Sequence, residues 1–127
     1  MARPSVLIVD DHAGFRSTAR DLLSASGFEV VAEAADGLSA ISEAGRVRPS
    51  VVLLDVQLPD IDGFAVARRL LEVPEPPVVV LISTRDARDY GHKLADSGAA
   101  GFITKGHLSG ATLRAMLLPV EEEPIGG

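Results

Sequence analysis

The sequence predicts one α/β domain built on a five-stranded parallel sheet in the order 2-1-3-4-5, with helices on both faces. Short apolar runs alternate with segments of helical periodicity, which is the pattern of consecutive βα units. Right-handed connections between such units place the first and third strands side by side, where the strand order reverses. A chain of 127 residues, 46% of them hydrophobic, is large enough for one such core.

Five apolar runs define the expected strands, and glycine, proline and aspartate mark the helix ends between them. The strands are expected at residues 5–9, 28–34, 51–54, 78–82 and 101–104. Gly27 is expected to end the first helix, and Gly45 with Pro49 to stop the second. Asp62 is placed to cap the third helix, and Ser109 lies near the start of the last one.

The segment between the fourth and fifth strands, residues 85–97, differs from the others. Its apolar anchors are few, chiefly Tyr90, Leu94 and Ala95. Gly91 is expected inside this helix, where glycine costs roughly 1 kcal/mol relative to alanine. We therefore expect it to be the least stable helix. Low local stability is typical of a moving or partner-binding element, but a poorly packed edge helix without a role is an equal alternative.

Composition argues against several classes of protein. A net charge of −6 argues against a nucleic-acid surface, and the absence of cysteine excludes disulfides and thiolate metal sites. No apolar run is long enough to span a membrane, so a cytoplasmic protein is expected. Residues 1–118 are predicted to form the domain. Residues 119–127 are predicted to form an acidic flexible tail, which is compatible with a linker to a further domain.

Chemically active side chains follow the strands of the predicted sheet. Asp10 and Asp11 follow the first strand and Asp55 the third, while Ser83 and Lys105 follow the fourth and fifth. Because the carboxyl ends of parallel strands meet at one edge, we expect these groups to share one crevice. Taken singly, an aspartate or serine here would be ordinary as a helix cap, and a lysine as a solvated surface residue.

Three carboxylates so close together repel one another unless a cation lies between them. A hard divalent cation such as Mg²⁺ takes oxygen ligands and is held by one or two carboxylates together with a substrate phosphate. A carboxylate beside it can attack phosphorus and form an aspartyl phosphate. Lys105 can then neutralise charge on the phosphoryl oxygens, and Ser83 can donate a hydrogen bond to one of them.

The chain resembles the receiver domain of two-component response regulators over roughly residues 4–118. The resemblance rests on the acidic pair after the first strand, the segment 55–63 (DVQLPDIDG), Ser83-Thr84 after the fourth strand and Lys105 after the fifth. The segment 101–106 (GFITKG) is most similar to receivers of the LuxR or nitrate-response type, which usually carry a helix-turn-helix output domain that is missing here. The resemblance implies a flavodoxin-like doubly wound (βα)5 fold.

The resemblance also implies a role for each matching residue. Asp55 would accept the phosphoryl group, Ser83 would contact it, and Lys105 would pair with it. The implied ligands of Mg²⁺ (or Mn²⁺) are Asp10, Asp11, Asp55 and the backbone carbonyl of Gln57. The roughly two added negative charges would bias a surface formed by the fourth helix, the fifth strand and the fifth helix.

Four further positions are expected to control the switch. Phe102 would be the switch aromatic that turns inward as Ser83 moves toward the phosphoryl group, although an ordinary core role is the alternative. Phe102 has no hydroxyl, so packing must carry the coupling through its ring. Thr84 is bulkier than the residue usual at its position and is expected to narrow access to the acceptor or hinder the turning ring. Gln57 and Arg85 occupy positions that tune dephosphorylation by water.

The implied function is a signalling switch rather than an enzyme with a separate substrate. A histidine kinase or a histidine phosphotransfer protein would supply the phosphoryl group. The switched surface would bind a downstream protein in trans, an output domain absent from this chain, or a second copy in a homodimer. The alternative is a receiver-fold interaction module that signals without phosphorylation. A phosphatase is disfavoured because Gln57 stands where a general acid is needed, and a flavin-binding role because the loop after the first strand is acidic.

Overall fold

A computed structural model describes residues 3–117 and contains one five-stranded parallel sheet. The strands lie in the order β2-β1-β3-β4-β5, which confirms the predicted topology. Their bounds are β1 Ser5–Val9, β2 Glu29–Ala34, β3 Val51–Asp55, β4 Val78–Ser83 and β5 Gly101–Thr104. The predicted acidic tail, residues 119–127, lies outside the described residues.

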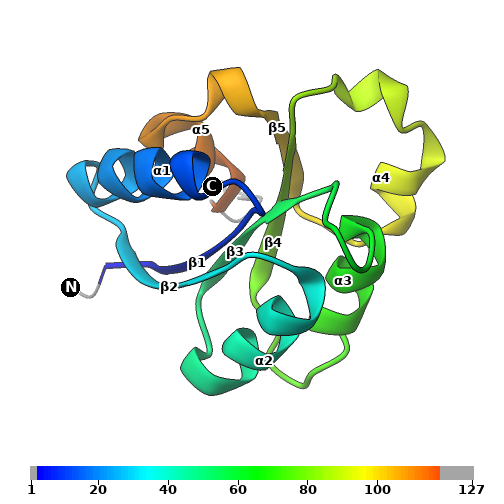
Figure 1. Cartoon of the computed structure of the whole chain (residues 1–127), viewed down its shortest axis with the longest axis horizontal. Helices are drawn as coiled ribbons and strands as arrows, with labels where there is room; N and C mark the ends of the chain where they lie inside the picture. The colour runs from blue at the N-terminus through cyan, green and yellow to red at the C-terminus, as the bar shows by residue number, and fades with distance from the viewer. Residues whose placement is uncertain (1–2, 118–127) are drawn as a thin grey trace, which may run out of the picture.

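Helices cover both faces of the sheet (Figure 1). Helices α1 and α5 pack on one face, and α2, α3 and α4 pack on the other. The helix bounds are α1 Ala13–Ala25, α2 Gly37–Val47, α3 Gly63–Leu70, α4 His92–Asp96 and α5 Gly110–Leu117, with two 3-10 turns, η1 Ala87–Asp89 and η2 Lys105–His107. None of the helices within residues 3–117 is long and apolar enough to cross a membrane.

Residues of the central strands alternate between two cores, one on each face of the sheet. Val51 and Leu53 of β3 pack with side chains of α1 and α5, whereas Val52 and Leu54 pack with side chains of α2 and α3. All four are fully buried. A strand that is covered on both faces has to be apolar throughout, which explains why β3 and β4 are continuous apolar runs in the sequence.

Three of the predicted helix ends are confirmed. Gly27 follows α1 with a φ of 95°, a left-handed conformation that glycine adopts without strain. Asp62 caps α3, because its side chain accepts a hydrogen bond from the backbone N–H of Ala65 at 2.9 Å. Ser109 lies directly before α5, and its hydroxyl accepts a hydrogen bond from the backbone N–H of Thr112 at 3.0 Å.

The prediction that Gly45 stops the second helix is wrong. Helix α2 continues to Val47 and ends at Arg48, which adopts the left-handed conformation with a φ of 47°. Glycine can adopt the helical backbone conformation, so Gly45 lowers the stability of the helix without ending it. Pro49 follows at once and, having no N–H, cannot extend the helix.

The segment between β4 and β5 is not one helix as predicted. Residues 85–97 instead form η1 and the five-residue α4. Gly91 lies between the two with a φ of 58°, so it separates them rather than standing inside a helix. Neither η1 nor α4 contains a buried residue. Few packing contacts therefore hold this segment, which is the physical basis for expecting low local stability.

Two arginines of α1 hold that helix against β2. Arg16 Nε lies 3.0 Å from Glu33 Oε1, and Arg20 Nε lies 2.6 Å from Glu33 Oε2. The hydrogen bond from Arg20 is the main cause that lowers the pKa of Glu33. Partial burial opposes that effect, and Arg16 lowers the pKa further. Glu33 therefore stays ionised at neutral pH and bridges the two arginines.

Gly63 gives a test of how tightly α3 packs against the end of β3. A Cβ at this position would lie 2.7 Å from the Cα of Val56 and closer still to the backbone of Asp55. We expect Gly63→Ala to lower the free energy of unfolding by about 1–3 kcal/mol in urea titration, because backbone must shift. Gly45→Ala is the matched control: nothing lies within 4 Å of the added methyl, so this variant should gain about 0.5–1 kcal/mol. Equal effects of the two variants would contradict this packing.

Glu33→Gln is expected to lower the free energy of unfolding at pH 7 by up to about 1 kcal/mol, the range of partly exposed ion pairs. Because the folded-state pKa of Glu33 lies below its ordinary value of 4.5, its contribution is full above that pH and is lost as the pH falls through the lower folded-state pKa. Urea unfolding at decreasing pH should therefore show the difference between wild type and variant disappearing in acid.

The control for this titration is Glu29→Gln in the same strand. Glu29 is exposed and forms no ion pair within the described part of the chain. This variant should differ little from wild type in stability, because it removes no ion pair of the described residues. A stability difference for Glu33→Gln that persists in acid would show that something other than the carboxylate charge is responsible.

Candidate functional site

The pairing register of the sheet brings the predicted acidic residues together. Val9 of β1 pairs with Leu54 of β3. Asp10 and Asp55 each come one residue later, so they end neighbouring strands at the same level. Strand β5 ends at the same edge, and Lys105 follows it. Strand order and register together therefore place two carboxylates and an ammonium at the carboxyl ends of three strands, as predicted.

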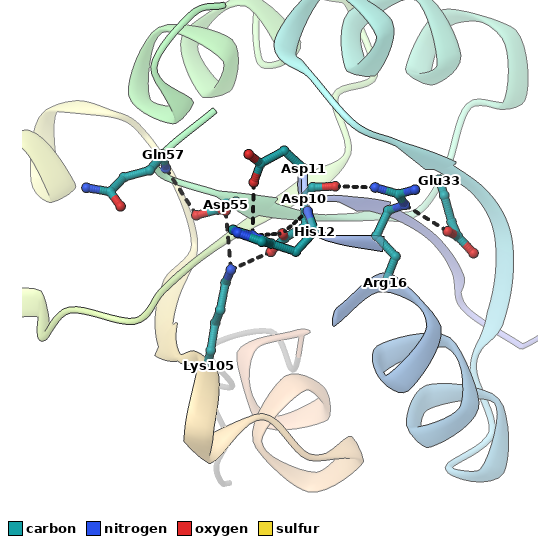
Figure 2. A network of polar contacts seen from close by, with 8 residues as sticks. All are labelled: Asp10, Asp11, His12, Arg16, Glu33, Asp55, Gln57 and Lys105. Carbon is teal, nitrogen blue, oxygen red and sulfur yellow. Dashed lines mark hydrogen bonds and ion pairs between the residues drawn. The ribbon is translucent and has the colours of Figure 1, made fainter. Parts of the chain in front are cut away.

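Lys105 joins the two buried carboxylates (Figure 2). Its Nζ lies 2.6 Å from Asp10 Oδ2 and 3.3 Å from Asp55 Oδ2. Asp10 is 0% exposed and Asp55 is 3% exposed. Within residues 3–117 the Lys105 ammonium is the group that balances the buried Asp10 Oδ2. Without Lys105, two neighbouring carboxylates would be buried uncompensated.

Burial decides how this cluster ionises. Loss of water raises the pKa of Asp55. The backbone N–H of Gln57, which donates to Asp55 Oδ1 at 3.0 Å, lowers this pKa. The negative charge of Asp10 raises it, and the positive charge of Lys105 lowers it. Together these effects leave the pKa of Asp55 above its ordinary value. Burial also lowers the pKa of Lys105, but the two carboxylates outweigh burial and raise that pKa. Lys105 is therefore charged at neutral pH, and Asp55 is more basic than a carboxylate in water.

Contacts on both sides hold the aspartate loops in place. Arg16 Nη1 donates a hydrogen bond to the backbone carbonyl of Asp10 at 2.7 Å, which fixes the turn after β1 (Figure 2). Asp60, in the loop after β3, accepts hydrogen bonds from the backbone N–H groups of Gly37 and Leu38 at 2.7 and 3.0 Å. The N–H of Gly37 is the largest cause that lowers the pKa of Asp60. This charged contact ties the loop after Asp55 to the first turn of α2.

Four side chains at this edge could together hold a metal ion. Asp10, Asp11, His12 and Asp55 each offer one ligand atom, and these atoms all lie within 4.8 Å of one another. His12 Nδ1 lies 3.1 Å from Asp11 Oδ1 and 3.2 Å from Asp10 Oδ1. Carboxylate oxygens are the donors that a hard divalent cation prefers, so this donor set fits Mg²⁺ or Mn²⁺.

Ser83 does not join this cluster. Alternation along β4 places its side chain on the face covered by α3 and α4, whereas Asp55 and Lys105 continue the rows that face α1 and α5. The Ser83 hydroxyl lies 2.6 Å from the Tyr90 hydroxyl and accepts a hydrogen bond from the backbone N–H of Arg85 at 3.0 Å. In the described structure no hydrogen bond links Ser83 to Asp55 or Lys105.

The remaining predicted residues surround the cluster. Phe102 is half-buried, and its ring centroid lies 6.0 Å from that of Tyr90. The side chains of Gln57, Thr84 and Arg85 are exposed. The backbone N–H of Gln57 donates to Asp55, and that of Arg85 donates to Ser83. These three side chains are therefore in contact with solvent, near the carboxyl ends of β3 and β4.

Sequence reasoning missed four groups that the structure places at the site. His12 directly follows the acidic pair, so its position was a usable signal. Tyr90 was counted only as an apolar anchor, although a partly buried tyrosine usually finds a partner for its hydroxyl. Arg16 and Glu33 are 17 residues apart on different elements, and no local pattern connects them.

Comparison with known proteins gives the family. The model of the response regulator receiver domain matches residues 6–117. The DNA-binding transcriptional activator EvgA of Escherichia coli (strain K12) is 31% identical over 101 residues, covering 80% of this chain and 50% of EvgA. The putative positive transcription regulator of virulence factors BvgA of Bordetella pertussis is 35% identical over 100 residues, covering 79% of this chain and 48% of BvgA. This chain thus spans about half the length of these relatives.

Solved structures of response regulators have the same fold as this chain. The receiver domain of the putative response regulator NarL from Mycobacterium tuberculosis superposes with a TM-score of 0.83 at 33% identity, covering 91% of this chain and 98% of that one. The chemotaxis response regulator CheY4 of Vibrio cholerae superposes with a TM-score of 0.82 at 25% identity, covering 91% of this chain and 100% of that one. With an acidic edge on a sheet of this order, the chain belongs to the response regulator receiver domains of two-component systems.

Proposed function

We propose that this chain accepts a phosphoryl group on Asp55 from a histidine kinase or a histidine phosphotransfer protein, and so switches a protein-binding surface. The observation that carries the proposal is the buried Asp55 carboxylate, which shares the Lys105 ammonium with Asp10 at the carboxyl edge of the sheet. A buried carboxylate with a cation beside it is the arrangement that aspartyl phosphate formation requires.

Asp55 is suited to nucleophilic attack on phosphorus. Burial raises its pKa and therefore its basicity, while the Gln57 N–H orients its carboxylate. In the transfer, a carboxylate oxygen forms a bond to phosphorus as the phosphorus–nitrogen bond of phosphohistidine breaks. The electron pair of that bond returns to the imidazole of the donor. Lys105, 3.3 Å from Asp55, is placed to pair with the phosphoryl oxygens.

Mg²⁺ or Mn²⁺, when bound, would neutralise charge that develops on the phosphoryl oxygens. The proposed ligands are the clustered carboxylates of Asp10, Asp11 and Asp55, together with the backbone carbonyl of Gln57. The chain itself holds these groups in position. Arg16 fixes the backbone of Asp10, and Asp60 fixes the loop that follows Gln57. These contacts come from α1 and α2, so both helices support the metal ligands.

Ser83 and Phe102 are proposed to connect the acceptor to the surface. Ser83 would donate a hydrogen bond to a phosphoryl oxygen, and the half-buried Phe102 would change its packing in response. Thr84 is proposed to limit access to Asp55. Gln57 and Arg85 are proposed to set the rate at which water removes the phosphoryl group, since their side chains are exposed at that edge.

The partners follow from this chemistry. A cytoplasmic kinase or phosphotransfer protein supplies the phosphoryl group. The switched surface, made of α4, β5 and α5, binds a downstream protein in trans, an output domain in a longer chain, or a second copy of this domain. An output domain is supported by the relatives EvgA and BvgA, which are about twice the matched length and are described as transcription regulators. This domain is proposed to contact neither nucleic acid nor membrane directly.

The proposal is tested by intact mass after incubation with acetyl phosphate and Mg²⁺. We expect wild type to gain one phosphoryl group, as acetate leaves with the electron pair of the broken phosphorus–oxygen bond. Asp55→Asn should gain none, and EDTA should abolish the gain in wild type. Asp96→Asn, at the end of α4, is the matched control and should behave as wild type because its carboxylate lies at an exposed helix end. Loss of the gain in both variants, or phosphorylation of Asp55→Asn, would refute Asp55 as the acceptor.

A further inference from the structure

The only tyrosine of the chain connects the segment after β4 to Ser83. The Tyr90 hydroxyl lies 2.6 Å from the Ser83 hydroxyl. The Tyr90 ring packs edge-on against Phe64, with centroids 5.4 Å apart, and lies beside Phe102 at 6.0 Å. The Phe64 contact and the hydroxyl bond tie η1 and α4 to the body of the domain, because neither element contains a buried residue of its own.

The Tyr90–Ser83 contact faces away from the acceptor. Ser83 is 1% exposed and lies on the α3 and α4 side of the sheet, while Asp55 and Lys105 belong to the rows that face α1 and α5. The Ser83 hydroxyl already has two partners on its own side, the Tyr90 hydroxyl and the Arg85 N–H. Because the two residues lie on opposite sides of the sheet, a hydrogen bond to a group on Asp55 requires the Ser83 hydroxyl to turn, and this turn breaks the contact with Tyr90.

We propose that Tyr90 is a positioning residue that holds the Ser83 hydroxyl away from Asp55 in the unmodified protein, and that a phosphoryl group on Asp55 competes for this hydroxyl. The inference rests on the proposed function, since it needs an anion on Asp55. When the anion takes the hydroxyl of Ser83, Tyr90 loses its hydrogen bond. Modification of Asp55 is thereby transmitted to η1 and α4 through a phenol rather than through the ring of Phe102 alone.

The competition favours the anion. A hydrogen bond to a charged phosphoryl oxygen is roughly twice as strong as one between two neutral hydroxyls. The released Tyr90 hydroxyl is left half-buried without its partner, an unfavourable state that repositioning of Tyr90 relieves. Gly91 follows directly with a φ of 58°, and α4 beyond it is five residues long, so little structure resists such a movement.

The first test uses the single tyrosine as a probe. In protein labelled with ¹³Cζ-tyrosine, beryllofluoride with Mg²⁺ serves as the phosphoryl analogue, and ¹⁹F NMR reports its binding. We expect the Tyr90 Cζ resonance to shift when the analogue binds. In Ser83→Ala without analogue, the resonance should already lie away from its resting wild-type position, because the hydroxyl partner is gone. A wild-type complex that forms with no movement of the resonance would overturn the role of Tyr90 while leaving the acceptor function intact. Failure of the complex to form would overturn both.

The second test measures affinity for the same analogue. Tyr90→Phe keeps the ring and its contacts with Phe64 and Phe102 but frees Ser83. We expect this variant to bind beryllofluoride between about twofold and tenfold more tightly than wild type. In the Ser83→Ala background, the same substitution should have no effect, because the contact is already absent. Unchanged or weaker binding by Tyr90→Phe, or an equal effect in both backgrounds, would overturn the proposal. A purely packing role for Tyr90 would leave Tyr90→Phe indistinguishable from wild type.

Discussion

Two neighbouring carboxylates are buried next to one ammonium, and this arrangement restricts how the surrounding strands and loops can pack. Asp10 and Asp55 end adjacent strands, so their repulsion has to be offset where water cannot do so. The cation comes from β5, which is separated from β3 by β4, about 10 Å away at the usual strand spacing. Only a long side chain such as that of Lys105 spans this distance, so the cluster requires all the central strands in register.

The loops around the cluster are held by charged contacts to the backbone, in addition to the apolar packing of Val56, Leu58 and Ile61. Arg16 reaches the carbonyl of Asp10 from α1, and Asp60 receives N–H groups of α2. Gly63 brings α3 so close to β3 that no side chain fits between them. These contacts keep the two carboxylates close together although their negative charges repel each other. The same geometry makes the edge a place where a cation and a phosphoryl group are stabilised.

Because side chains alternate along the strands, the charged groups of the site and the residues proposed to respond to phosphorylation lie on opposite faces of the sheet. Asp10, Asp55 and Lys105 continue the rows that face α1 and α5, while Ser83 faces α3 and α4 together with Tyr90 and Phe102. On the first side, ion pairs and hydrogen bonds connect the charged groups to one another and to the backbone. The second side ends in a short segment with no buried residue in η1 or α4. A domain built in this way can hold its acceptor fixed and still change its surface.

The five strands, their order, and the meeting of Asp10, Asp55 and Lys105 could be predicted from the amino-acid sequence, because apolar runs and right-handed connections specify where parallel strands end. It misplaced Gly45 and Gly91, since glycine is compatible both with a helix and with a break. The pairing of Ser83 with Tyr90 and that of Arg16 with Glu33 are visible only in the three-dimensional structure. Those pairs depend on register, twist and side-chain direction between separate elements, and no local periodicity encodes them.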